Sequence, residues 1–341
     1  MRLWAYPIIV SPLPVSAIDL GSHEALRRQR AFARQDARGW RLPPVPALPY
    51  PEGMFGLLNV NKPPGPTSHD VVAEVRRRLP EKTKAGHAGT LDPFAAGVLV
   101  LCVGPATRLA SYVQTAPKRY SAGITLGASS GTDDLTGEIT NTPNAVPPPE
   151  EQVRQALARW VGQVQQVPPA HSAVHVSGRR AYKLARRGET PELPPRAVAI
   201  HAIELLRYEY PELEIDVRCG SGTYIRALAR DVGADLGVGG YCSRLSRTEV
   251  GSFRIDSAVA LEAVDPAADL ISPIVAVGHL PKIAMDAESA GLLAHGKTVR
   301  LPAPHSPGET AVVTQQGDLL AIARVCPDGT TLAPRKVFLP G

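Results

Sequence analysis

The segment that begins at Met54 changes its hydrophobic pattern in the way expected for a strand followed by a helix. Residues 56–60, GLLNV, form a short apolar run, and the proline-rich NKPPGP after it predicts a tight turn. Val71, Val72 and Val75 then recur at helical spacing, with Thr67 or Ser68 in the position of an N-cap. The pattern therefore predicts a strand, a turn and a helix.

The same periodicities predict elements further along the chain. Residues 118–140 alternate like a hairpin strand and end in turn residues, and PPPEEQVRQALARWVGQV begins a helix with proline and acids. LEIDVRCGSGTYIRALARDVGADLG predicts a strand that runs through GSG into a helix ending at Gly237. Beyond about residue 275, a helical DAESAGLLAHG precedes three short strands, TAVVTQ, LLAIARV and RKVFLP.

These elements indicate a mixed α/β (α+β) protein with two folded domains. We expect the larger one at residues 54–270 and a small β-rich one at residues 275–341. Residues 1–53 combine one possible short helix with RLPPVPALPYPEG, which has the composition of a linker. We expect this N-terminal extension to be disordered, or Met54 to be the true start.

Composition narrows the class of protein. Of the 341 residues, 44% are hydrophobic and 20% are charged, as in ordinary soluble globular proteins. The longest apolar run, residues 98–103, is too short to span a bilayer, so we expect no membrane association. The four cysteines are widely spaced and form no CxxC pair, which argues against a structural metal site and favours the reducing cytoplasm.

The net charge of +5 says little about partners until it is divided along the chain. Residues 1–53 contribute +3 (seven arginines, four acids), so the remaining residues contribute only +2. A site for a polyanion must therefore come from local clusters of basic residues. Such clusters are RRR at 76–78 with Lys82 and Lys84, Lys118 with Arg119, and GRRAYKLARR at 178–187.

GLLAHGKT, residues 291–298, matches the phosphate-loop pattern GxxxxGK[ST]. That loop needs a strand before it and a helix after it, so that backbone amides face the phosphates. Here a helical stretch precedes the motif and the extended VRLPAP follows it. We therefore expect a helix C-cap at Gly296 and no nucleotide cofactor.

Asp92 is the single carboxylate in GHAGTLDPFAAGVLVLCVGPATRL, residues 86–109. By local preference it is the N-cap of a helix over Phe94–Leu101, with Pro93 in the first turn. The small residues before it, however, allow a ligand to approach closely, and His87 and Thr90 add polar groups. An ionised carboxylate in such a loop is also suited to act as a nucleophile.

Arg226 can supply the positive charge that such a carboxylate needs. It follows the glycine-rich GSGTY and falls in the first turn of the predicted helix, where its guanidinium could pair with Asp92 and hold the pKa of that carboxyl down. The alternative is a surface Arg226 with a core Tyr224.

Two further motifs also have a simpler interpretation. KRY, residues 118–120, places Tyr120 beside two cations, which suits a stacked base next to phosphates. It equally fits an edge strand with flanking charges, which is favoured for the motif by itself. GTDDLTGE contains two acids, and its flanking glycines favour an ordinary turn.

Taken in order, five motifs resemble the bacterial tRNA pseudouridine-55 synthases of the TruB family. They are LLNVNKPPGPTSHDVV, GHAGTLDPFAAGVL with GPATRL, KRY, PPAHSAVHVSGRRAYKLARRG and GSGTYIRALARDVG, between about residues 54 and 253. The resemblance implies a pseudouridine synthase fold with a mixed, largely antiparallel sheet and flanking helices, followed by a small PUA-like RNA-binding domain. It also implies a tRNA partner bound through its T-arm stem-loop, no metal and no organic cofactor.

The resemblance also assigns roles to individual residues. Asp92 matches the catalytic aspartate, and Arg226 matches the arginine that pairs with it. Tyr120 matches the aromatic residue that stacks on the target base, and Tyr224 an active-site tyrosine. Two further residues match: Lys62, which supports the site, and His87, which takes the place of the extruded base in the T-loop.

The chain departs from the family's pattern at three positions. His171 and His175 stand where the family has tyrosine and lysine, and Asn61 replaces a common aspartate. The substrate contacts near residues 171–175 are therefore less secure than the chemistry.

The expected reaction breaks the bond between ribose C1′ and N1 of uridine 55 and joins C1′ to C5. Asp92 attacks either the base or C1′, and the base must first flip out of the folded loop. We expect a monomeric enzyme. The alternatives are an RNA-binding or tRNA-folding chaperone on the same scaffold, the same chemistry on another RNA, and a nucleotide hydrolase that uses GLLAHGKT.

Overall fold

The computed structural model describes residues 54–172, 175–176, 179–180 and 193–338. The N-terminal extension predicted at residues 1–53 and most of the basic stretch 178–187 lie outside these residues. No described helix is long and apolar enough to cross a membrane.

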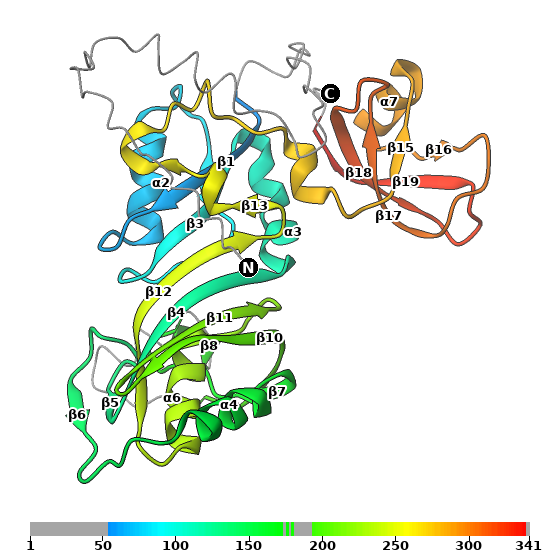
Figure 1. Ribbon diagram of the computed structural model, residues 1–341. Helices are drawn as coiled ribbons and strands as arrows, with labels where there is room; N and C mark the ends of the chain where they lie inside the picture. Colours follow the sequence, from blue (N-terminus) through cyan, green and yellow to red (C-terminus); the bar gives the residue numbers. More distant parts are fainter. Residues whose placement is uncertain (1–53, 173–174, 177–178, 181–192, 339–341) are drawn as a thin grey trace, which may run out of the picture. The chain divides into compact units, whose positions relative to one another are not determined.

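One large sheet organises the part of the chain that contains Asp92 (Figure 1). Its strand order is β14-β1-β3-β12-β4-β11-β10-β7, with β2 paired to β3 and β13 paired to β12. Neighbouring strands are antiparallel except for β1 with β14 and β3 with β12. The prediction of a mixed, largely antiparallel sheet is confirmed. Its strands are β1 (Gly56–Lys62), β2 (Ala85–His87), β3 (Ala96–Val103), β4 (Lys118–Leu126), β7 (Gly162–Gln166), β10 (Arg196–Glu209), β11 (Glu212–Cys219), β12 (Gly240–Val250), β13 (Phe253–Arg254) and β14 (Val259–Ala260).

Three helices bury their apolar stripes in one core on the same face of this sheet. They are α2 (Ser68–Arg77), α4 (Glu150–Arg159) and α6 (Ile225–Asp235). Val71, Val72 and Val75 of α2 are buried, as the helical spacing predicted. Thr67 is the N-cap and forms a capping box with Asp70. The predicted strand, turn and helix are confirmed. The opposite face is covered in part by a 3₁₀ helix, Gly104–Leu109, and by α3 (Ala110–Thr115).

The prediction of a helix over Phe94–Leu101 is wrong, because β3 occupies Ala96–Val103. This strand pairs with β1 along the full length of β1 and is buried on both faces. Leu99, Leu101 and Val103 face one core while Val98, Val100 and Cys102 face the other. A strand covered on both faces reads as a continuous apolar run, which local helix-capping preferences cannot distinguish from a helix.

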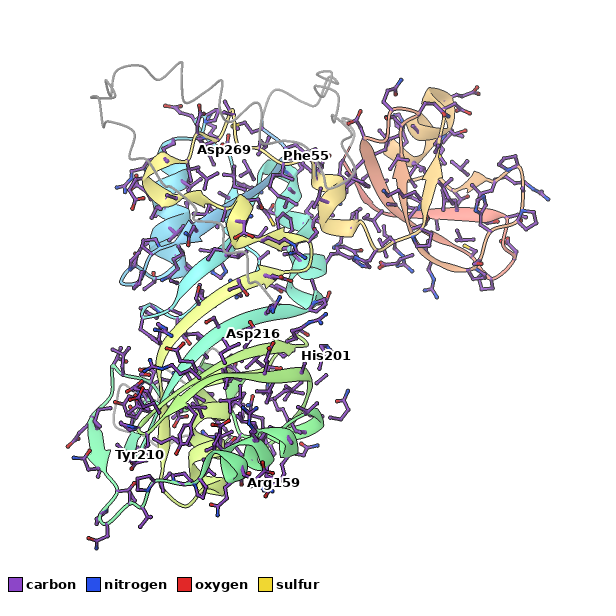
Figure 2. The ribbon with its side chains drawn as sticks, in the orientation of Figure 1. Phe55, Arg159, His201, Tyr210, Asp216 and Asp269 are labelled. Atoms are coloured by element: carbon purple, nitrogen blue, oxygen red, sulfur yellow. The ribbon has the colours of Figure 1, made fainter. Side chains whose placement is uncertain are left out.

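The edge-strand interpretation of KRY is also wrong, because β4 lies inside the sheet between β12 and β11. On β4, successive side chains point to opposite faces. Tyr120 is buried, whereas its neighbour Arg119 pairs with Asp216 at 2.7 Å (Nε to Oδ1). Asp216 belongs to β11 and is labelled in Figure 2. Tyr120 therefore belongs to the core side of a central strand.

A second, five-stranded sheet follows near the C-terminus in the order β15-β17-β18-β19-β16. Here the phosphate-loop match lies at the end of α7 (Ala287–Ala294): the Gly296 amide donates to the Leu293 carbonyl, with φ +75° at Gly296. The predicted end of the helix is confirmed within one residue: the C-cap is His295, and Gly296 is the residue after it, in the left-handed conformation that commonly ends a helix. A strand follows, not the helix that a phosphate-binding loop needs. The strands are β15 (Lys282–Ala284), β16 (Val299–Arg300), β17 (Gly308–Val313), β18 (Leu319–Val325) and β19 (Thr331–Val337). Two small hairpins complete the described strands: β5 (Ala128–Ser130) with β6 (Ile139–Asn141), and β8 (His175–Val176) with β9 (Arg179–Arg180). Three further 3₁₀ helices span Ile255–Ser257, Leu261–Ala263 and Pro273–Val277.

Candidate active site

The loop between β2 and β3 presents Asp92 and is tied down through its main chain. The Ser68 hydroxyl, at the start of α2, donates to the Leu91 carbonyl (2.9 Å) and accepts from the Leu91 amide (2.8 Å). On the other side of Asp92, the Gly65 amide donates to the Pro93 carbonyl at 2.8 Å. The NKPPGP turn and the helix after it therefore fix the loop on both sides of the acid.

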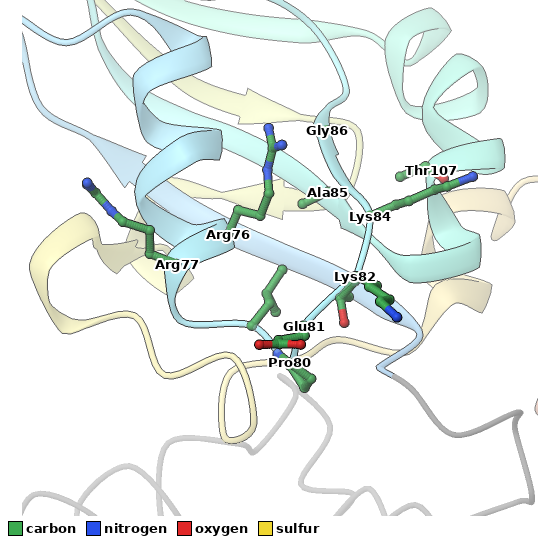
Figure 3. A pocket seen from close by; sticks show the side chains of 11 residues that line it. Arg76, Arg77, Pro80, Glu81, Lys82, Lys84, Ala85, Gly86 and Thr107 are labelled. Carbon is green, nitrogen blue, oxygen red and sulfur yellow. The ribbon is translucent and has the colours of Figure 1, made fainter.

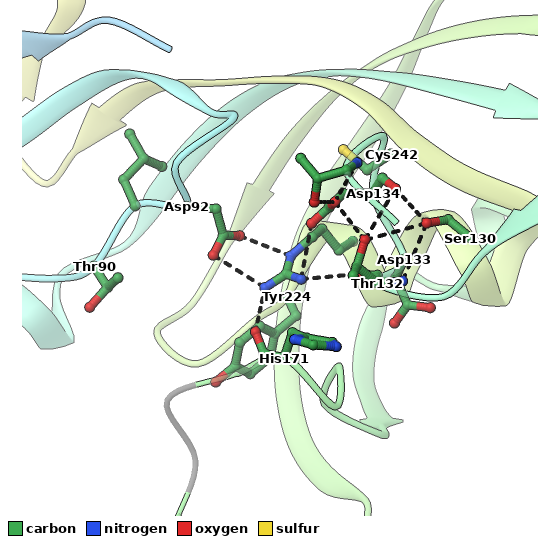
Figure 4. Close-up of polar contacts among 12 residues, drawn as sticks. Thr90, Asp92, Ser130, Thr132, Asp133, Asp134, His171, Tyr224 and Cys242 are labelled. Carbon is green, nitrogen blue, oxygen red and sulfur yellow. Dashed lines mark hydrogen bonds and ion pairs between the residues drawn. The ribbon is translucent and has the colours of Figure 1, made fainter. Parts of the chain in front are cut away.

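Asp92 forms a two-point ion pair with Arg226 (Figure 4). The Arg226 Nε lies 2.9 Å from Asp92 Oδ2, and Nη2 donates to Oδ1 at 3.2 Å. The Asp92 side chain keeps 32% of its surface exposed, whereas the Arg226 side chain keeps 4%. The structure thus brings together the pair that the sequence predicted, with the acid facing outward and the arginine beneath it. The interpretation of Arg226 as a surface residue is wrong.

A second carboxylate, Asp134, holds Arg226 from the opposite side. Arg226 Nη1 lies 3.1 Å from Asp134 Oδ2 and donates to the Thr132 carbonyl at 3.0 Å, while Nη2 donates to the His171 carbonyl at 3.1 Å. Asp134 itself is buried and accepts hydrogen bonds from the Thr132 hydroxyl and from the Thr136 amide and hydroxyl. One arginine therefore compensates two carboxylates.

The interpretation of GTDDLTGE as an ordinary turn is incomplete for this reason. Its second acid, Asp134, pairs with Arg226, and its first, Asp133, pairs with Arg230 at 2.8 Å (Oδ2 to Nη1). Arg226 and Arg230 are four residues apart on α6 and so lie on the same face of the helix. A matching pair of acids and a pair of arginines at helical spacing was the signal in the sequence.

The pKa of Asp92 is raised above its ordinary value. Burial of the carboxyl group has the largest effect, because it destabilises the charged form; Arg226 opposes it and Asp134 adds to it. Arg226 thus lowers the pKa of Asp92 as expected, but burial has the larger effect, so the net shift is upward. Part of the side chain reaches solvent, yet the protein surrounds most of the carboxyl group.

Lys62, at the end of β1, is fully buried beside the same loop. Its Nζ donates to the carbonyls of Pro63 (2.8 Å), Pro93 (3.1 Å) and Ala95 (2.7 Å). Burial lowers the pKa of Lys62 to about 8, while the charge of Asp92 works in the other direction. Lys62 thus contacts the backbone that follows Asp92, which fits the supporting position implied by the family resemblance.

Arg247, on β12, also donates to the backbone around Asp92, a role that was not predicted from the sequence. Its Nε donates to the Val98 carbonyl at 2.8 Å, Nη1 to Thr90 at 3.2 Å and Nη2 to Gly89 at 3.1 Å. The side chain is buried, although RLSRTEV has the alternating pattern of a strand with one exposed polar face. β12 also passes very close to β3: a Cβ at Gly97, where φ is +105°, would lie 2.2 Å from the Arg247 carbonyl oxygen.

Tyr120 and Tyr224 both lie within electrostatic reach of Asp92. Tyr120 is 8% exposed, and burial raises the pKa of its hydroxyl, which interacts with Arg247. Tyr224 is the residue before α6, partly exposed, with its amide donating to Gln166 Oε1 at 2.8 Å. Two aromatic residues thus lie near the aspartate, and their roles toward a base stay predictions.

His87 lies at the end of β2 and packs edge-on against His69 of α2, with ring centroids 5.1 Å apart. Burial lowers the pKa of His87 to about 4, so its ring is neutral at pH 7. No hydrogen bond or ion pair joins His87 to Asp92 or Arg226 in the described part of the chain. Its place in the RNA loop stays a prediction.

The three departures from the family's pattern occupy different positions. His171 contributes its backbone carbonyl to Arg226, a contact that does not depend on the side chain. His175 lies on β8, and Asn61 is partly buried on β1. The substitution at residue 171 therefore leaves the contact with Arg226 in place.

Comparison with known proteins agrees with this geometry. The model of the TruB family pseudouridylate synthase N-terminal domain matches residues 76–225. A tRNA pseudouridine synthase B from Microcystis aeruginosa is 47% identical over 255 residues, which cover 73% of this chain and 85% of the relative. One from Dehalococcoides mccartyi is 41% identical over 293 residues, covering 84% and 97%. A chain in a solved Cbf5–Nop10–Gar1 complex matches with a TM-score of 0.66 at 27% identity, covering 84% and 85%.

The sheet, the aspartate–arginine pair and these similarities define an RNA-modifying enzyme of the pseudouridine synthase class. Within that class, the chain belongs to the TruB family.

The shared arginine leads to a prediction about stability. A carboxyl whose pKa is raised on folding stabilises the folded state at low pH, where it is protonated, and loses that contribution as pH rises through the raised pKa. We expect Asp92→Asn to increase the free energy of unfolding, by more at pH 8 than at pH 4.5, since Asp134 still compensates Arg226. Urea denaturation at both pH values measures this. A loss of stability that is equal at both would contradict it.

Arg247 leads to a second prediction. Arg247→Met leaves one buried and two partly buried carbonyls without their donor, so we expect the free energy of unfolding to fall by more than about 2 kcal/mol, with part of the loss restored by Arg247→Lys. Arg244→Met on the same strand is the control, because Arg244 is exposed and pairs with Glu214 at 2.9 Å (Nη2 to Oε1); a change below about 1 kcal/mol is expected there. Equal effects at 244 and 247 would refute the role of Arg247.

Proposed function

We propose that this protein is a tRNA pseudouridine synthase that converts uridine 55 in the T-loop of tRNA into pseudouridine, with Asp92 as the nucleophile. The observation that carries the proposal is the Asp92–Arg226 pair: an accessible carboxylate oriented at two points by a buried guanidinium. The relatives named tRNA pseudouridine synthase B support tRNA as the substrate. The position of the uridine rests on the family resemblance.

In the proposed reaction, the bond from ribose C1′ to N1 breaks and a bond from C1′ to C5 forms. Asp92 attacks the base or C1′, and in either case its carboxylate must be ionised and correctly directed, which is the task of Arg226. The proton on C5 then leaves to solvent and N1, released from C1′, takes up a proton from solvent, so the net change is an isomerisation without oxidation or reduction. Asp92 is released unchanged.

The surrounding residues bind and orient the uridine. The base must leave the folded RNA loop, and stacking on an aromatic ring stabilises a flipped base. We assign this stacking to Tyr120, with Tyr224 on the other side of Asp92. His87, neutral at pH 7, takes the vacated place in the RNA loop, and Lys62 holds the loop that carries the acid.

We further propose that the enzyme acts as a monomer in the cytoplasm. Asp92, Arg226, Asp134, Lys62 and Arg247 all come from one chain, so the site is assembled without a second copy. The free thiols of Cys102, Cys219, Cys242 and Cys326 suit a reducing compartment. We assign the catalytic domain to residues 54–270, and the five-stranded sheet within residues 275–341 to RNA binding.

Release of tritium from [5-³H]uridine in a T-arm stem-loop tests the proposed activity. We expect the wild-type chain to release tritium and Asp92→Asn to release none while still binding the RNA, since only the nucleophile is lost. Binding without release by the wild type would instead support an RNA chaperone. Release from other RNAs, with none from the T-arm, would support the same chemistry on a different substrate.

The orientation of Asp92 is tested separately by Arg226→Lys. An ammonium cannot make the two-point contact with Asp92 and reach Asp134 as well, so we expect turnover to fall about 100-fold with little loss of RNA affinity. Arg230→Lys is the matched control, since Arg230 lies one turn later on α6 and pairs with Asp133. Unchanged turnover in Arg226→Lys, or an equal loss in both variants, would refute the orienting role.

A further inference from the structure

We propose that a basic hollow at the end of α2, outside the catalytic loop, binds a backbone phosphate of the RNA strand next to the modified nucleotide. This inference rests on the proposed function, which supplies an RNA substrate. The hollow has a volume of about 790 Å³ (Figure 3). It is lined by Arg76, Arg77, Leu79, Pro80, Glu81, Lys82, Thr83, Lys84, Ala85, Gly86 and Thr107.

The charge of the hollow favours an anion. Four basic side chains line it, against Glu81 as the one acid among the lining residues. Arg77 is already paired with Glu74. In contrast, Arg76, Lys82 and Lys84 are exposed, and their side chains form no hydrogen bond or ion pair with any other described residue. These three cations are therefore available to a ligand.

The loop that presents them is built with a specific backbone conformation. Lys82 has φ +63°, in the left-handed region that residues with a side chain rarely adopt. The Thr83 amide closes this turn by donating to the Pro80 carbonyl at 3.2 Å. Strained conformations of this kind occur preferentially at ligand sites, and here the strain falls on one of the available cations.

Strand β2 and helix α2 connect the hollow to the part of the candidate site that contains His87. Lys84 directly precedes β2, which ends at His87, and His87 contacts His69. His69 and Arg76 are seven residues apart on α2, so they share a face and are separated by about 10 Å along the helix axis. One face of α2 thus runs from the histidine that we place in the RNA loop to the basic hollow.

The chemistry of the lining favours the RNA backbone over a base. No aromatic side chain is among the lining residues, so none is present on which a base could stack. Flexible cations without an aromatic partner typically contact phosphates, which position a nucleic acid without reading its sequence. We therefore expect the hollow to strengthen binding of structured RNA in general and to add no base preference.

The test is the salt dependence of binding by the full chain. The equilibrium dissociation constant for a T-arm stem-loop RNA is measured at several salt concentrations for wild type and for Lys82→Gln/Lys84→Gln. Each lost phosphate contact should make the slope of log K against log [salt] shallower by about 0.7 to 1, with weaker binding at low salt. Arg76→Gln, tested separately, should act in the same direction.

Arg154→Gln/Arg207→Gln is the matched control, because it removes the same net charge from arginines already paired with Glu150 and Glu209. An unchanged slope in the hollow variants, or an equal change in the control, would overturn the inference. So would weaker binding without a change in slope, or capture of an acidic peptide with no effect on RNA. If the wild type binds RNA with the expected slopes but releases no tritium, the proposed function fails while the hollow stands.

Discussion

The site depends on one buried guanidinium that two carboxylates share. Removing a charged group from water costs several kcal/mol unless other charges and hydrogen bonds compensate it. Arg226 meets this condition through Asp92, Asp134 and two backbone carbonyls, which come from three separate segments of the chain. Because Asp134 already balances the arginine, Asp92 is not needed to neutralise it. The outer carboxylate is thereby left available for chemistry.

The backbone around Asp92 is fixed by a second set of interactions that involve no other acid. Lys62 from β1, Ser68 from α2 and Arg247 from β12 donate to carbonyls on both sides of the aspartate. These donors are buried in a sheet and a helix whose own packing is continuous, so the loop cannot shift without breaking several buried hydrogen bonds. Such a loop holds Asp92 in one orientation before any substrate arrives, which is the main advantage of a preorganised site.

Much of this arrangement could be predicted from local sequence. The N-cap at Thr67 and the helix after GSG follow from residue types whose preferences agree with the fold. The pairing of Arg226 with Asp92 is not local, since 134 residues separate them, and it was expected because the carboxylate needs a cation and because both motifs match the family. The helix expected at Phe94–Leu101 failed because a local cap preference competed with burial on both faces of a central strand, and burial is the larger effect. Asp134 and Arg247 were missed because their partners lie far away in sequence, 92 and 157 residues in two of the contacts. For Asp134 the one signal was the match between two adjacent acids and two arginines at helical spacing, and the alternating strand that contains Arg247 gave none.

The shared arginine also leads us to expect that the ionised Asp92 makes this site less stable than a neutral residue would. With two carboxylates around one guanidinium, one negative charge is in excess, and burial adds to the energy of the ionised Asp92. A neutral residue at position 92 would remove that excess, so the charge is retained at the expense of stability. Because the Asp92 side chain is still partly exposed, water solvates part of the carboxylate and limits the energetic cost of its charge. When an RNA base covers that face, the water leaves and the interactions of the carboxylate with Arg226 and with the substrate become stronger. In the proposed reaction, the binding step and the reactivity of Asp92 would therefore be linked through the same loss of solvent.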